Sequence, residues 1–130
     1  MNWMRVAVFS FILLISQVVA DGLASYIVFA YTMYDGTSVH LLVSNYLASF
    51  VVSTSILSVL AFKQFERPLL HTGAVAFFCL SIGSVLSCLF IEELMPASLY
   101  LADIAFTICV VFIATKLGVV WRVKECSSYS

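Results

Sequence analysis

The stretch KQFERP, residues 63–68, interrupts an apolar chain near its midpoint. It brings Lys63, Glu66 and Arg67 together between two apolar runs and closes on Pro68. Proline is tolerated in the first turn of a helix, so Glu66-Arg67-Pro68 is expected to end one helix and start the next. The stretch therefore predicts a chain built from two halves, residues 1–66 and 67–130.

The composition indicates a membrane protein. Of the 130 residues, 63% are hydrophobic and 10% are charged, and the mean hydropathy is +1.11. A soluble domain is closer to half apolar and a quarter charged. We therefore expect an all-α, polytopic membrane protein with a single integral membrane domain over residues 1–130. The net charge of −1 gives no indication of a nucleic-acid partner.

Turn residues separate the apolar runs on either side of the central stretch. Asp35-Gly36-Thr37-Ser38 is typical of a turn followed by a helix-capping serine. The segment from Glu92-Glu93 through Pro96 separates two further runs. Runs of about 20 apolar residues are typical of membrane helices. Four spans are expected, paired as two hairpins: Val6–Tyr31 with Val39–Phe62, and Leu69–Ile91 with Leu99–Trp121.

The charged residues outside the spans differ between the loops. The N-terminus, the central stretch and the C-terminus carry Arg5, Lys63, Arg67, Arg122 and Lys124. The other two loops carry Asp35, Glu92 and Glu93, without Lys or Arg. Loops rich in Lys and Arg stay on the cytoplasmic side. We therefore expect both termini and the central loop in the cytoplasm, and a multi-pass protein of the cytoplasmic membrane.

The first span allows a second interpretation. Arg5, the apolar core Val6–Ile15 and Val18-Val19-Ala20 are similar to a signal peptide that is cut before Asp21. Apolar character continues well past that point, to Tyr31. This continuation favours an uncleaved span, although cleavage after residue 20 would fit the same distribution of charges.

Two segments share a pattern that indicates an internal repeat. NYLASFVVSTSILSVLAFK (Asn45–Lys63) and LYLADIAFTICVVFIATK (Leu99–Lys116) both contain Tyr-Leu-Ala near their start and close on a lysine. Each is the second span of an expected hairpin, so both copies run from outside to inside. Internal repeats are frequent in transporters. Either duplication or the shared interface chemistry of two parallel helices explains the pattern.

Four short spans, a 2+2 repeat and a basic, aromatic end to each second span resemble the GtrA family of small bacterial membrane proteins. The first span of that family typically carries an acid among apolar residues, as Asp21 does here. Leu101-Ala102 and the run from Phe112 to Lys116, followed by Trp121, are similar to the family's even-numbered spans. The resemblance implies a role in surface polysaccharide or teichoic acid glycosylation, in which a polyprenyl-phosphate-linked sugar crosses the membrane.

Asp21 belongs to a polar row on the first span. Helical spacing places it on one face with Ser10, Gln17 and Ser25. Such a face must meet protein or water rather than lipid. The second span carries a matching row at Asn45, Ser49 and Ser53.

We expect the two rows to pack together as an intramembrane polar path, with Asp21 near Gln17 and near Asn45 or Ser49. Two roles are open for this acid. It is either a hydrogen-bonded packing contact or a group that carries protons or contacts a ligand, because ionisable residues inside a membrane are functional candidates by default.

Basic residues near the expected cytoplasmic ends of the spans form a second candidate site. Lys63, Arg67, Lys116 and Arg122 would make a ring that suits a phosphate or diphosphate headgroup. Lys116 can also extend towards the cytoplasm from within the fourth span. The same four residues satisfy the positive-inside rule without any ligand.

Two further features have structural interpretations. Asp103 lies near the start of the fourth span, where an acid suits the positive end of the helix dipole. Small residues of the third span, namely Gly73, Ala76, Gly83, Ser84 and Ser87, would allow close helix approach within or between protomers.

Three functions remain open from the sequence. The leading one is translocation of a polyprenyl-phosphate-linked sugar, or a role as the membrane partner of a glycosyltransferase. The second is a small, dimeric, proton-coupled exporter that uses Asp21. The third is a non-transporting subunit of a membrane complex. No nucleophile with a base, phosphate loop or metal spacing occurs in the sequence, so we expect neither an enzyme nor a cofactor.

Overall fold

The computed structural model describes residues 3–32, 39–90 and 97–128. These residues form four helices, α1 (Trp3–Thr32), α2 (Val39–Lys63), α3 (Pro68–Phe90) and α4 (Ala97–Ser128). Each helix is long and apolar enough to cross a membrane. The expectation of an all-α protein with four candidate spans is thereby confirmed.

The helix boundaries agree with the predicted spans except at the end of α4. The predicted fourth span ends at Trp121, whereas α4 continues to Ser128. The helix continues past the predicted span because the charged residues Arg122, Lys124 and Glu125 end an apolar run without ending a helix. Long charged side chains are good helix formers. The predicted turns at 35–38 and 92–96 lie outside the described residues.

The turn between α2 and α3 is the one predicted from KQFERP. Arg67 adopts a φ of 47°, in the left-handed region. Proline disfavours the right-handed helical conformation in the residue before it, so Arg67 cannot simply continue α2. Its carbonyl accepts the backbone N–H of Leu70 at 3.1 Å, and α3 therefore begins at Pro68.

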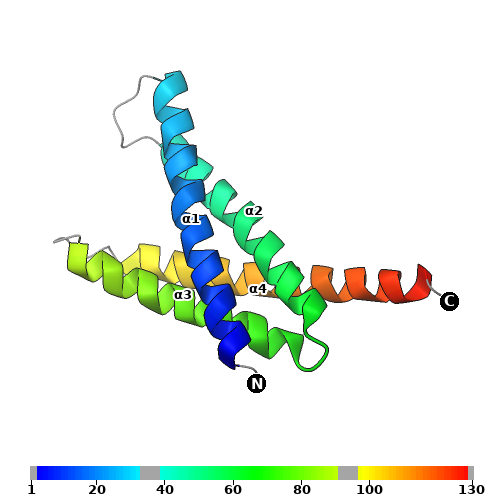
Figure 1. The fold of residues 1–130 in the computed structure, drawn as a ribbon. Helices are drawn as coiled ribbons and strands as arrows, with labels where there is room; N and C mark the ends of the chain where they lie inside the picture. The colour runs from blue at the N-terminus through cyan, green and yellow to red at the C-terminus, as the bar shows by residue number, and fades with distance from the viewer. Residues whose placement is uncertain (1–2, 33–38, 91–96, 129–130) are drawn as a thin grey trace.

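The four helices cross near the ends that meet at this turn. We call this the basic end, because Arg5, Lys63 and Arg67 lie there; the far end is where α1 and α3 end and α2 and α4 begin. Figure 1 shows that the far ends of α1 and α2 point away from those of α3 and α4, so the molecule opens as a V. α2 contacts all three other helices.

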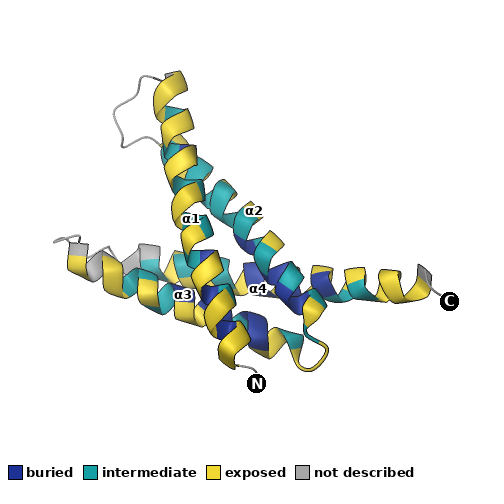
Figure 2. Ribbon diagram, in the orientation of Figure 1, coloured by how far each residue is buried: buried dark blue, intermediate teal, exposed yellow. Residues whose placement is uncertain are grey.

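The buried core lies at the crossing (Figure 2). Leu60 and Ala61 of α2, Val75 of α3 and Ala114 of α4 are completely inaccessible, and Val6 of α1 joins them. Large apolar side chains are exposed elsewhere along all four helices. Such exposure would be costly in water, but it suits helices whose surroundings are lipid.

α2 and α4 approach each other closely at Gly118. A Cβ atom at this position would lie 2.4 Å from the Ser58 carbonyl oxygen and 2.7 Å from the Ala61 Cβ. A Cβ atom at Gly73 or Gly83 would meet nothing within 4 Å. The close approach that the sequence placed on the third span is therefore not made through these two glycines within the chain.

Candidate functional site

A cavity of about 390 Å³ lies between the helices, on the far side of the buried core. Cavities that bind small molecules typically measure about 300–1,000 Å³. All four helices line the cavity, from Leu13 and Leu57 at its base to Tyr100 and Asn45 towards the far end. Leu13 and Leu57 at this base are themselves buried in the core at the crossing.

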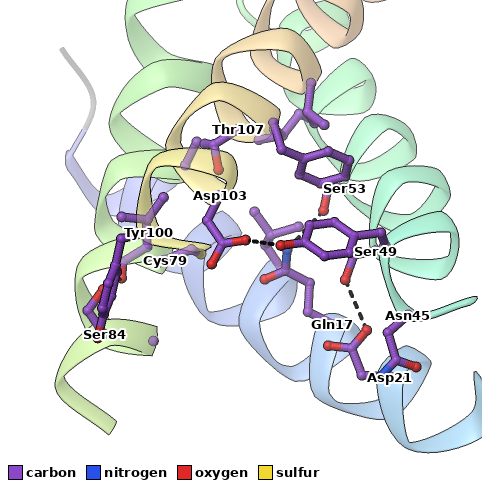
Figure 3. A pocket seen from close by; sticks show the side chains of 18 residues that line it. Gln17, Asp21, Asn45, Ser49, Ser53, Cys79, Ser84, Tyr100, Asp103 and Thr107 are labelled. Atoms are coloured by element: carbon purple, nitrogen blue, oxygen red, sulfur yellow. Dashed lines mark hydrogen bonds between the residues drawn. The ribbon is translucent and has the colours of Figure 1, made fainter. Parts of the chain in front are cut away.

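One wall of the cavity is built by the polar rows of α1 and α2. All five residues of the predicted polar path line it: Gln17, Asp21, Asn45, Ser49 and Ser53. The Ser49 hydroxyl donates to Asp21 Oδ1 at 2.9 Å, and Gln17 Nε2 donates to Ser53 Oγ at 2.9 Å (Figure 3). The two rows therefore pack together as expected, and Ser49 is the partner of Asp21.

Asn45, the other partner considered for Asp21, is bonded elsewhere. Its Oδ1 accepts a hydrogen bond from the Ser25 hydroxyl at 3.4 Å. This contact extends the line of polar contacts between α1 and α2 towards the far end.

The opposite wall comes from α4, with Tyr46 of α2 reaching across to it. The Tyr46 hydroxyl donates to Asp103 Oδ1. The Tyr46 ring also meets the Phe106 ring edge-on, with 5.2 Å between ring centroids. The centroid of the Phe50 ring lies 6.1 Å from that of Phe106. A polar contact and an aromatic cluster thus join α2 to α4 beside the cavity.

Asp103 is a cavity residue that the sequence interpretation missed. The predicted contact with the helix dipole is wrong, because α4 begins at Ala97 and Asp103 lies beyond its first turn. The dipole effect falls off within that turn. Two signals could have identified the residue: its spacing from Tyr100 and Thr107, which share a helix face with it, and its place three residues after a Tyr-Leu-Ala tyrosine, like Ser49.

The cavity combines hydrogen-bonding groups and aromatic faces with two acidic side chains. Asp21 and Asp103 are its carboxylates, and its described lining includes no Lys, Arg or His. Among the residues that the structure describes, no three His, Cys, Asp or Glu side chains are placed to hold a metal ion. The arrangement can bind hydroxyl-rich or cationic groups.

A second hollow, of about 530 Å³, lies at the basic end. Arg5, Lys63 and Arg122 line it, together with Glu125. The predicted basic ring is therefore gathered in part. Lys63 and Arg122 share this hollow, while Arg67 and Lys116 are exposed and are not among its lining residues.

Arg122 donates hydrogen bonds to backbone carbonyls at the end of α2. Its Nε donates to the Phe62 carbonyl at 2.8 Å, and its Nη2 donates to the carbonyls of Ala61 and Gln64. The guanidinium also lies over the Phe65 ring, 4.6 Å from its centroid. These contacts tie α4 to the end of α2, and they leave fewer Arg122 N–H groups for a phosphate.

Comparison with known protein families, with curated proteins and with solved structures finds no match to this chain. Function is therefore inferred from the residues of the cavity and of the basic end.

Proposed function

We propose that this chain is a multi-pass protein of the cytoplasmic membrane that moves a polyprenyl-phosphate-linked sugar across that membrane, as a GtrA-like protein, alone or as the partner of a glycosyltransferase in cell-surface polysaccharide synthesis. The observation that carries the proposal is the polar, partly aromatic cavity between four otherwise apolar helices.

The chemistry of a sugar supports this assignment. Moving a hydroxyl group into an apolar medium without a hydrogen bond costs several kcal/mol, roughly 4–8 on a cyclohexane scale, so a sugar needs polar partners at every depth. Gln17, Asn45 and Ser53 offer donors and acceptors along the cavity wall, and Tyr46 and Phe106 offer ring faces. The prenyl tail would stay in lipid, against the exposed apolar side chains.

The proposed orientation places the basic end in the cytoplasm and the far end outside, with two hairpins at residues 1–66 and 67–130. Arg5 and Lys63 would then attract the phosphate group on the cytoplasmic side. The buried core separates this hollow from the cavity, so the two act in succession. The headgroup first meets the basic end, and the core must open before the sugar reaches the cavity.

Two serines of α2 test this path as a matched pair. Ser53 lines the cavity and bonds Gln17, whereas Ser55 is exposed and bonds the Val51 carbonyl of its own helix at 2.7 Å. In vesicles that contain the purified protein and a polyprenyl-phosphate hexose, we measure how fast the sugar becomes accessible to an external oxidant. Ser53→Ala should slow translocation about threefold, as expected for a lost membrane hydrogen bond of about 0.6 kcal/mol.

Ser55→Ala should match the wild type. Equal rates in the two variants would remove the cavity from the path. A wild-type protein that translocates no faster than protein-free vesicles would overturn the function itself and would favour a non-transporting subunit.

The second candidate function is a dimeric, proton-coupled exporter. It is favoured by Asp21, a carboxylate on the wall of a membrane cavity. An exporter should expel a soluble substrate when a pH gradient is imposed, and Asp21→Asn should abolish that response. Translocation of the lipid-linked sugar without any pH gradient would favour the first function.

A further inference from the structure

We infer that the group bound in the cavity carries a protonated amine, so that the translocated sugar is an amino sugar with a free amino group. The lipid-linked part of this inference rests on the proposed function. The preference for an amine rests on the cavity itself, and in particular on the carboxylates that two different helices bring to it.

The two carboxylates approach the cavity from different helices. Asp21 comes from α1 and Asp103 from α4, and the polar groups between them belong to α2 (Figure 3). Because both acids line the same cavity, a ligand between α1 and α4 would lie near a carboxylate of either helix. Among the described residues, no Cα atom of α1 comes within 8 Å of a Cα atom of α4, which leaves space for a ligand between these two helices.

Each carboxylate is only partly satisfied by the protein. Asp21 accepts one hydroxyl through Oδ1, from Ser49, and Asp103 accepts one through Oδ1, from Tyr46. The Oδ2 atom of each acid has no hydrogen-bond partner among the described residues. A primary ammonium group has three donors and no acceptor, so it can donate to the open oxygen of either carboxylate.

The electrostatics of the cavity favour a cation over a neutral or anionic group. Hydroxyl donors such as those of Ser49 and Tyr46 do not neutralise a carboxylate, and the described lining includes no basic side chain. Attraction between opposite charges is several times stronger near protein than in bulk water. The rings of Tyr46 and Phe106 add faces that attract cations. An acidic sugar would be repelled.

The test compares two lipids that differ only at one nitrogen. The full-length protein in lipid nanodiscs is titrated with a polyprenyl-phosphate hexosamine that has a free amine and with its N-acetylated form, which is neutral at that nitrogen. The free amine should bind about tenfold more tightly or better. Asp21→Asn and Asp103→Asn, which keep side-chain shape, should each reduce that preference, and the double variant should abolish it.

Glu66→Gln is the matched control, because Glu66 is an exposed acid in the turn at the basic end. It should leave the preference unchanged. Equal binding of both lipids to the wild type would overturn the inference and leave the proposed function intact. This comparison needs no variant, so it stands even if Asp103→Asn fails to fold.

A third arm separates the two sources of an amine. Phenethylamine is a free, protonated aromatic amine without lipid or phosphate. If it binds with the same dependence on Asp21 and Asp103 while neither lipid-linked sugar binds, the amine preference is supported and the proposed function falls in favour of the exporter. If none of the three probes binds, both are overturned.

Discussion

At the scale of the residue, Asp21 is costly to place in a membrane helix and gains little from its hydrogen bond. Its bond from Ser49 spans 2.9 Å, and interhelical hydrogen bonds in membranes contribute about 0.6 kcal/mol on average. Placing an aspartate at the centre of a membrane helix costs about 2.5–3.5 kcal/mol on insertion scales. The hydrogen bond offsets only a small part of that cost. Under the proposed function, its place on the wall of the polar cavity explains the residue better than packing does.

Arg122 is expected to stabilise the protein by capping α2. The last carbonyls of a helix have no partner within it, and Arg122 donates to two of them, Ala61 and Phe62, and to the Gln64 carbonyl just past the helix end. Hydrogen bonds to charged groups contribute about 1.5–3 kcal/mol. Arg122→Gln should therefore lower the free energy of unfolding by roughly 1–3 kcal/mol, measured by denaturation in mixed micelles.

Lys124→Gln is the control, because Lys124 lies on the same helix end and is exposed. It removes the same charge without touching α2. Equal losses in the two variants would show that net charge matters and that capping does not.

At the scale of the helices, α2 is the element on which the others are arranged. It contacts α1 through polar groups beside the cavity and α4 through the close approach at Gly118. The two contacts differ in kind. The first leaves room for a ligand, whereas the second excludes even one methyl group.

Gly118→Ala should therefore disrupt the crossing of α2 and α4. The new Cβ would stand 2.4 Å from the Ser58 carbonyl oxygen, and the backbone there cannot move aside cheaply. Overpacking of this kind costs about 1–3 kcal/mol. The loss should appear as a lower unfolding temperature of the purified protein.

Gly73→Ala and Gly83→Ala are the controls. Both glycines lie inside α3 with open space around the missing Cβ, and alanine is the better helix former by up to about 1 kcal/mol. These variants should match or exceed the wild type. Equal destabilisation at all three glycines would contradict the crossing seen in the structure.

At the scale of the whole molecule, the protein has two parts: a packed core at the crossing and an open V towards the far end. Completely buried residues such as Leu60 and Ala114 lie at the crossing, and the cavity lies beyond them towards the far end. Under the proposed orientation, the polar cavity belongs to the outer half of the membrane and the basic hollow to the cytoplasmic surface.

This orientation makes a direct topological prediction. A reporter fused after Ser130 should be active only in the cytoplasm, and a tag inserted between Asp35 and Ser38 should react with an impermeant label from outside. Basic residues hold their flanking segments on the cytoplasmic side, so an external C-terminus would reverse the assignment. In the same preparation, N-terminal sequencing that starts at Asp21 would show that the first span is cleaved as a signal peptide.

The sequence by itself determined the class, the number of helices and most of their boundaries. Long apolar runs leave the backbone no partner but itself in lipid, so they form helices wherever they occur. Pro68 marked the central turn because proline disfavours a helical conformation in the residue before it. Helical spacing also predicted the row that holds Asp21, because residues four apart share a face.

The tertiary structure alone decided which faces meet and where space remains. The contact of Tyr46 with Asp103 and the approach of Gly118 to Ser58 join residues more than 50 positions apart, and no local pattern encodes such a distance. The side chains of α3 that line the cavity were missed for this reason, whereas the helical spacing of Asp103 from Tyr100 and Thr107 could have pointed to it. Helix crossing depends on side-chain shape summed over a whole interface, and so the cavity exists only once all four helices are in place.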